Sequence, residues 1–140
     1  MSVEPEIELL QFVVCKDFRE ESQDHFLASS VVSNIYVPNF PHTPNYLHAV
    51  TCWRKDSRFH KEVIEYATDY GMSARSPHMD IEPVTDSVVF RWHTHRFPTD
   101  LTIEKPTTLT VRVILDGKAI FESYLLIESF SQPEKLAGSG

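Results

Sequence analysis

The chain has 140 residues, 41% hydrophobic and 24% charged, which is typical of one globular domain with a real core and excludes a fibrous or disordered chain. Its formal net charge of −7 argues against nucleic acid and anionic membrane surfaces as partners, because both attract basic proteins. No apolar run approaches the roughly 20 residues of a membrane span, and the N-terminus lacks the features of a signal peptide. We therefore expect a cytoplasmic protein without a membrane partner.

The N-terminal third predicts three strands separated by polar or proline-rich connections. The apolar run Glu6–Cys15 predicts the first strand, and the charged stretch Lys16–Asp24 predicts a solvated loop. Interleaved Ser and Val residues over Phe26–Val37 predict a second, half-buried strand. The prolines of residues 38–44 must end it, because proline cannot donate a ladder hydrogen bond. Alternating residues over Tyr46–Arg54 predict the third strand.

The middle of the chain is less clear. Residues His60–Tyr70 fit both a helical stripe and an alternating strand, and the surrounding strands favour the strand. Two prolines and mixed polarity over Met72–Pro83 predict a loop. The run Ser87–His95 then alternates again, with Phe90 and Trp92 on one face.

The last predicted element is a hairpin within residues 108–128, where two β-rich runs flank an Asp-Gly dipeptide. A two-residue turn would place Glu122 opposite Val111 on the apolar face. A three-residue loop, 115–117, places Phe121 there instead. Because a one-residue slip turns every side chain to the other face, burial selects this longer loop and places Phe121 in the core.

About seven strands with turn signals between them, and no clear helix, predict an all-β fold: a single antiparallel β-sandwich over residues 1–130. A disordered tail is expected over 131–140. Cys15 and Cys52 lie in apolar runs and are expected to be buried, reduced thiols. The absence of a Cys-x-x-Cys pair excludes a zinc or redox site of that kind.

The order of these elements resembles a family of small uncharacterised bacterial domains, catalogued as a domain of unknown function. An apolar first strand is followed by a strand rich in small residues. That strand leads into the aromatic and proline segment Ile35–Pro41, and the chain ends in the strand–Asp-Gly–strand hairpin Val111–Leu125. The resemblance implies a β-sandwich. It implies no activity and transfers no catalytic residue.

The strongest metal candidates are His93 and His95. Alternation places both imidazoles on one face of a strand, about 6.5–7 Å apart along it. A third ligand from a neighbouring strand could complete a zinc site. Three further histidines are the expected donors: His48, His60 and His78. The alternative is a solvated sheet face beside Arg91.

Nothing in the sequence supports an enzyme. Motifs of nucleophilic hydrolases, phosphate-binding loops and His-Glu-x-x-His metalloproteases are absent. With four glycines in the chain, no glycine-rich loop can hold a phosphate. No cofactor is therefore expected. The leading hypothesis is a non-enzymatic interaction or structural module, and the alternative is a metal-binding protein or metal-dependent enzyme that uses His93 and His95.

Two regions are candidate contact surfaces for a protein partner. Phe40 and Tyr46 flank prolines and could anchor an interface, or could instead cover an open end of the sandwich. The outer face of the last hairpin also carries apolar residues: Ile114, Ile120, Tyr124 and Leu126. A contiguous apolar patch usually marks a contact, which predicts a homodimer through this face. In the competing interpretation, residues 54–86 fold over the face and bury it.

Overall fold

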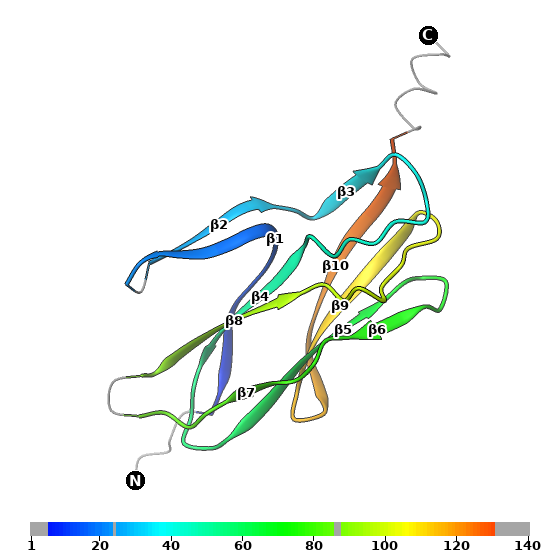
Figure 1. Cartoon of the computed structure of the whole chain (residues 1–140). Coiled ribbons are helices and arrows are strands. Elements are labelled where there is room, and N and C mark those ends of the chain that lie inside the picture. The colour runs from blue at the N-terminus through cyan, green and yellow to red at the C-terminus, as the bar shows by residue number, and fades with distance from the viewer. Residues whose placement is uncertain (1–5, 24, 86–87, 131–140) are drawn as a thin grey trace.

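The computed structural model describes residues 6–23, 25–85 and 88–130 (Figure 1). Within these ranges the chain forms ten strands and no helix. A helix able to cross a membrane is accordingly absent from the described part of the chain. The strands are β1 (Glu8–Ser22), β2 (His25–Val31), β3 (Asn34–Val37), β4 (His48–Arg54), β5 (His60–Ala67), β6 (Ser73–Arg75), β7 (Met79–Ile81), β8 (Phe90–Arg96), β9 (Thr107–Leu115) and β10 (Lys118–Ser129). The expected tail, 131–140, lies outside the described residues.

The strands form two sheets around one apolar core (Figure 1). The smaller sheet has the order β2-β1-β4-β8, and the larger has the order β3-β10-β9-β5-β6, with β7 also paired to β5. Every pairing is antiparallel except that of β3 with β10. The predicted all-β class is confirmed. The pairings are mostly antiparallel, whereas a wholly antiparallel sandwich was expected, and there are ten strands where about seven were expected.

Part of the difference lies in the N-terminal hairpin. The charged stretch Lys16–Asp24 was expected to be a loop, but β1 continues through it to Ser22 and pairs with β2. Most side chains of this hairpin arm are exposed, so polar residues are compatible with a strand there. The single strand expected over Phe26–Val37 is divided instead, because β2 belongs to the smaller sheet and β3 to the larger.

The middle segment also differs in part from expectation. The favoured strand over residues 60–70 is confirmed as β5, whose inward positions are all buried: His60, Glu62, Ile64 and Tyr66. The loop expected over Met72–Pro83 contains β6 and β7. These three-residue strands are too short for a periodic signal, and they exist because β5 offers them backbone partners.

The last hairpin closes through a two-residue turn, so the predicted three-residue loop is wrong. Asp116 and Gly117 both have positive φ, 52° and 82°, as a type I′ turn requires. A bulge then inserts Ile120 between two regular pairs, and Phe121 lies opposite Val113. The extra residue expected in the loop is therefore in the second strand, where it still keeps the apolar faces in register.

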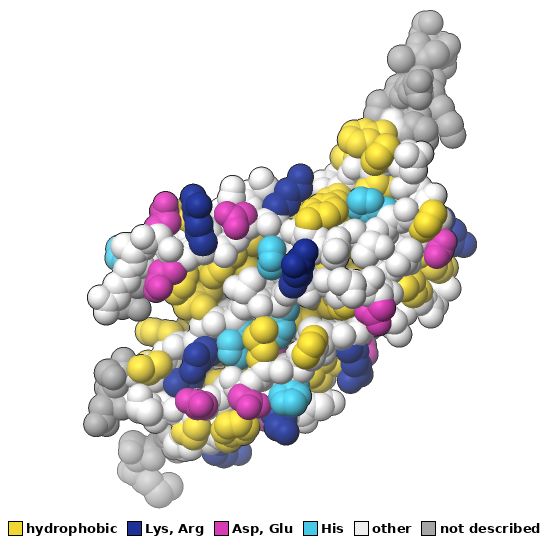
Figure 2. All heavy atoms as spheres, in the orientation of Figure 1, with side chains coloured by type: hydrophobic (Ala, Val, Ile, Leu, Met, Phe, Trp, Pro, Cys, Tyr) yellow, Lys and Arg dark blue, Asp and Glu magenta, His cyan; other side chains and the backbone are white. Residues whose placement is uncertain are grey.

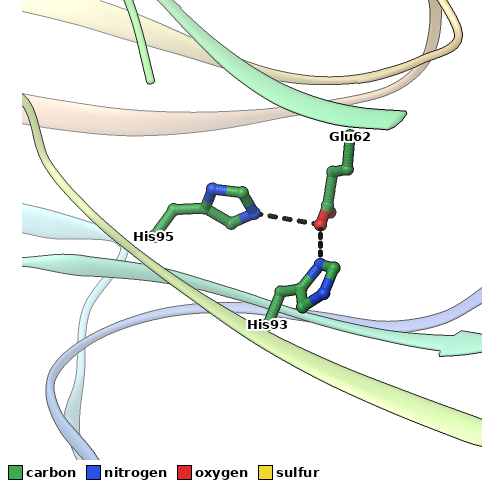
Figure 3. Close-up of side chains that lie close together, drawn as sticks. All are labelled: Glu62, His93 and His95. Atoms are coloured by element: carbon green, nitrogen blue, oxygen red, sulfur yellow. Dashed lines mark hydrogen bonds and ion pairs between the residues drawn. The ribbon is translucent and has the colours of Figure 1, made fainter. Parts of the chain in front are cut away.

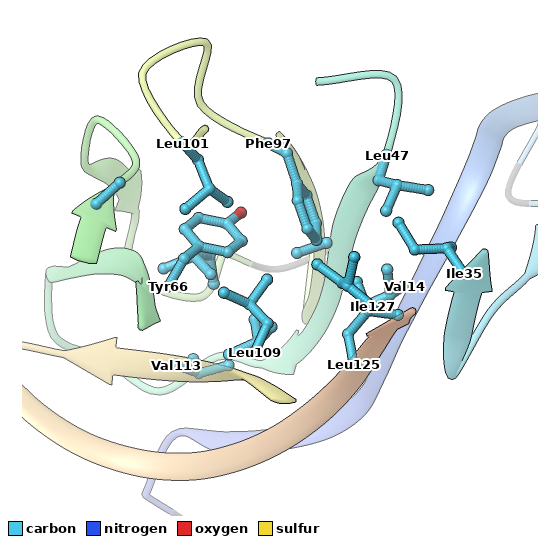
Figure 4. Packing of buried hydrophobic residues seen from close by; sticks show 14 of the residues in the cluster. Val14, Ile35, Leu47, Tyr66, Phe97, Leu101, Leu109, Val113, Leu125 and Ile127 are labelled. Carbon is cyan, nitrogen blue, oxygen red and sulfur yellow. The ribbon is translucent and has the colours of Figure 1, made fainter. Parts of the chain in front are cut away.

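The centre of the core is aromatic. The rings of Tyr66 and Phe97 lie 4.6 Å apart, among aliphatic side chains of both sheets (Figure 4). Phe97 is fully buried. Phe121 has the expected inward position but remains 40% exposed against Phe12, because it lies at an open end of the fold. The prediction that Phe121 belongs to the core is therefore wrong.

We expect Phe97→Ala to lower the free energy of unfolding by about 3–5 kcal/mol, because it leaves a cavity in a closed part of the core. Phe121→Ala should cause a clearly smaller loss, since solvent already reaches the ring. Urea denaturation of both variants measures the two losses. Equal losses would show that the open end contributes as much as the centre.

Polar contacts of His60 hold the start of β5. His60 lies between two carboxylates: Nε2 donates to Asp56 Oδ1 at 2.8 Å and Nδ1 to Asp116 Oδ2 at 2.6 Å. Burial alone would lower the pKa of His60, but the hydrogen bonds to Asp116 and Asp56 outweigh it and raise that pKa. Each ring nitrogen faces a carboxylate, which can only accept, so this geometry requires a proton on both, and the charged ring joins the hairpin turn to the β4–β5 connection.

Asp116→Asn should show how this contact depends on pH. A raised pKa in the fold gives stability that is complete below the unfolded pKa of about 6.5 and is lost as pH rises through the folded value. Asn also tolerates the left-handed turn, so the main loss is one carboxylate. We expect the stability difference from the wild type, measured by urea denaturation, to shrink from pH 6 to pH 9 (roughly the titration range of histidine).

The matched control is Asp100→Asn, an exposed carboxylate away from His60. Its difference from the wild type should stay small and flat over the same range. A flat, large difference for Asp116→Asn would instead assign the effect to the turn. Arg58, whose guanidinium lies 3.6 Å from Asp56, also attracts Asp116, but arginine stays charged from pH 6 to pH 9, so the loss of that attraction does not change over the range.

Candidate functional site

A cluster of three ionisable side chains, Glu62, His93 and His95, lies in the core between the sheets (Figure 3). Glu62 comes from β5 of the larger sheet, and the histidines come from β8, the edge strand of the smaller one. His93 Nδ1 donates to Glu62 Oε1 at 2.5 Å, and His95 Nε2 donates to the same oxygen at 3.0 Å. One carboxylate thus joins two sheets that face each other across the core.

The structure brings His93 and His95 together as their spacing predicted. The solvated face proposed as the alternative is wrong, because both rings point into the core. The apolar face of β8 lies outside instead. There Trp92 stacks on Phe18 of the β1–β2 hairpin at a centroid distance of 5.5 Å and contacts the tilted ring of Phe26 at 5.1 Å.

The third member of the cluster is Glu62, and the expected histidine donors are elsewhere. His60 is held between Asp56 and Asp116, and His78 lies 3.6 Å from Asp80 near the surface. His48 begins β4 and is not part of the cluster. The sequence did carry a signal for Glu62, because strand alternation places it on the same inward face of β5 as Ile64 and Tyr66.

The remaining oxygen of Glu62 is also paired. Trp53 Nε1 donates to Glu62 Oε2 at 3.0 Å. Burial alone would raise the pKa of Glu62, but the hydrogen bonds from His93 and His95 outweigh it and lower the pKa to about 2. Glu62 is therefore a carboxylate at neutral pH. Since it can only accept, the nitrogens facing it all carry protons.

Two other polar atoms in this layer are unsatisfied. Within the described ranges, buried His95 Nδ1 has no hydrogen-bond partner. The Thr51 hydroxyl lies close enough to lower the pKa of Glu62 but forms no well-aligned hydrogen bond with a described residue. A buried polar atom without a partner destabilises a fold by about 1–3 kcal/mol and is uncommon in native proteins. The region around Glu62 thus holds more buried polar atoms than its own hydrogen bonds satisfy.

The cluster has the composition of a metal site. Its three potential ligand atoms all lie within 4.8 Å of one another, and it is the one such group found among the described residues. Two imidazole nitrogens and a carboxylate oxygen form the protein ligand set of many zinc and non-haem iron centres. His93 remains 9% exposed, which gives the cluster its nearest approach to solvent.

The predicted contact residues of the β3–β4 connection lie at one end of the two sheets. Phe40 packs against the core. Tyr46 is exposed, and its hydroxyl lies 2.9 Å from His42 Nε2. The position of Phe40 is that of a residue covering the end of the core. A binding role for Phe40 and Tyr46 stays a prediction.

The outer face of the last hairpin is only partly as expected. Tyr124 and Leu126 are exposed on it, but Ile114 is buried. Ile120, at the bulge, lines an open pocket of about 650 Å³ with Phe121 and residues of β1. Strands β5 and β6, from the segment that was expected as a possible cover, do not cover the face, because they extend the same sheet on the far side of β9 (Figure 1).

The chain matches no protein-family model and no curated protein. The resemblance to a bacterial domain of unknown function stays a prediction, and function has to be argued from the geometry.

Glu62→Gln should lower the free energy of unfolding by about 3–5 kcal/mol at neutral pH, because removing one partner leaves buried polar groups uncompensated. An amide cannot accept from all three donors. Glu65→Gln on the same strand is the control, and its partly exposed ion pairs should be worth about 1 kcal/mol or less. Urea denaturation compares them.

The Glu62 effect should also depend on pH. Because the folded pKa is lowered from 4.5 to about 2, the contribution is complete above pH 4.5 and is lost as pH falls toward 2. The difference between wild type and Glu62→Gln should therefore shrink in acid. A difference that is equal at pH 7 and in acid would contradict the assignment of Glu62 as a buried carboxylate.

Proposed function

We propose that this protein binds one divalent transition-metal ion, zinc in the first place, between Glu62, His93 and His95. The observation that supports this function is the convergence of one carboxylate oxygen and two imidazole nitrogens inside the core, from opposite sheets. Such a ligand set is borderline in softness and suits zinc, whose tetrahedral sites combine nitrogen and oxygen ligands.

Binding would exchange hydrogen bonds for metal bonds. The histidine nitrogens that donate to Glu62 would lose their protons, so metal uptake would release protons and strengthen as pH rises. Trp53 would keep its hydrogen bond to the other carboxylate oxygen and orient Glu62. Three protein ligands leave a fourth position for water, and the Thr51 hydroxyl beside Glu62 is a polar group available to it.

His95 is the weaker of the two histidine ligands in this proposal. Coordination through Nε2 moves its proton to Nδ1, which has no acceptor among the residues described. Metal-bound histidines usually have such a partner, and losing one typically lowers affinity by about 10–100-fold. We therefore expect a site of moderate affinity that depends more on His93 than on His95.

Burial supports a structural or sensing role for the ion over catalysis. The cluster lies between the sheets, and His93 alone approaches solvent. An ion held by β5 and β8 would link the two sheets directly. Two sheets that share a core support the β-sandwich architecture expected from the sequence.

A non-enzymatic interaction module is the second candidate function, and exposed apolar side chains on β3 and β10 favour it.

Zinc titration of the chelator-treated protein tests the metal proposal. We expect one zinc ion per chain by calorimetry, and visible absorption bands of a low-symmetry site when cobalt(II) is used. His93→Gln should lose this binding, whereas His78→Gln, which alters an exposed histidine, should retain it. Zinc at about 100 times its dissociation constant should stabilise the wild type by about 2.7 kcal/mol.

Two results would reject the metal proposal. One is a wild-type protein that takes up neither zinc nor cobalt at neutral pH. The other is binding that survives unchanged in His93→Gln, which would place the ion elsewhere. Because His93 retains contact with solvent, this substitution should disturb the fold less than a change at fully buried Glu62.

A further inference from the structure

We propose that a second copy of this chain docks on the outer face of β3 and β10. This surface, the β3–β10 patch, consists of four large side chains: Tyr36, Tyr124, Leu126 and Phe130. Each is between 42% and 56% exposed. An apolar surface of this kind on a small protein usually marks a contact with another molecule.

The register of the strands makes the patch continuous. Leu126 lies beside Asn34 and Glu128 beside Tyr36 in the parallel β3–β10 pair. Tyr124 precedes Leu126 by two residues on the same side of β10. The ring of Phe130 lies 6.2 Å from that of Tyr36. The four side chains therefore follow one border of the larger sheet.

The fold leaves this face without an internal use. The alternate residues of the same strands are buried in the core: Ile35, Val37, Leu125 and Ile127. Strands β5 and β6, which could have covered the patch, instead extend the sheet beyond β9, away from β3. Exposure of the four side chains is thus a property of the folded monomer.

Charge favours a second copy as the occupant. Next to the patch, a chain of ion pairs crosses the same face, in which Glu122 binds Arg112 at 3.3 Å and Arg112 binds Glu65 at 3.1 Å. Arg75 then binds Glu65 at 2.7 Å. These two acids and two bases cancel, and Glu128 beside Tyr36 adds one acid on this side of β10, whereas the whole chain carries −7. Two copies can therefore approach through this face with less repulsion than their net charge otherwise causes.

The arrangement is also compatible with two-fold symmetry. In a two-fold contact the same surface occurs on both partners, so alternating charges can meet opposite charges while the apolar parts meet each other. A standard interface covers about 800 Å² on each partner, roughly a tenth of the surface of a small protein. The total surface here is 8558 Å², and the patch with its ion pairs extends over β3, β10, β9 and β5.

Light scattering coupled to size exclusion tests this proposal on the full chain in metal-free buffer, which separates it from the zinc proposal. We expect a dimer at micromolar concentration. The double variant Tyr124→Glu, Leu126→Lys should be a folded monomer. The control Val31→Glu, Phe59→Lys makes the same charge change at comparably exposed residues outside the patch and should remain dimeric.

A second pair of substitutions, Tyr36→Glu with Phe130→Lys, changes the other half of the patch. It decides the matter if the first pair fails to fold, and a folded monomer is again expected. A monomeric wild type overturns the proposal. So does a dimer that persists in a folded patch variant, or one that is lost equally in the control, because the contact would then lie elsewhere.

Discussion

A carboxylate cannot remain charged inside an apolar core unless other groups replace the water it has lost. Glu62 meets this condition with three donors, two from β8 and one from Trp53 of β4. All three belong to the smaller sheet, whereas Glu62 belongs to the larger. The relative position of the sheets is therefore specified by hydrogen bonds as well as by packing, which apolar contacts alone fix less sharply.

The same requirement determines which side of β8 faces inward. An inward-facing Trp92 would bury more apolar surface, yet the histidines occupy that side (Figure 3). The β1–β2 hairpin makes this possible, because it supplies Phe18 and Phe26 as partners for Trp92 on the outer side. Polar residues inside and an aromatic cluster outside are two parts of one arrangement. The space-filling view shows apolar side chains gathered beside the hairpin end of this face (Figure 2).

Alternation in the sequence was sufficient to predict the positions of β4, β8 and the two strands of the final hairpin, but not the turn and bulge that set the hairpin register. It failed where the deciding contact is distant. The inward side of His93 depends on Glu62, and the course of β1 beyond Cys15 depends on β2. Phe121 failed for a different reason. Alternation placed it on the correct face of β10, but its exposure depends on where the core ends, and no local sequence pattern indicates that.

The position of β3 has a consequence for how this chain is made. It follows β2 directly in the sequence, yet it belongs to the larger sheet and pairs in parallel with β10, a strand far along the chain. Strand β3 therefore has no sheet partner until β10 has been synthesised. Pairings between such distant segments form slowly, and the exposed intermediate is open to aggregation. A chain shortened by its final strand would lose more than one strand, since β3 would have no neighbour in the sheet.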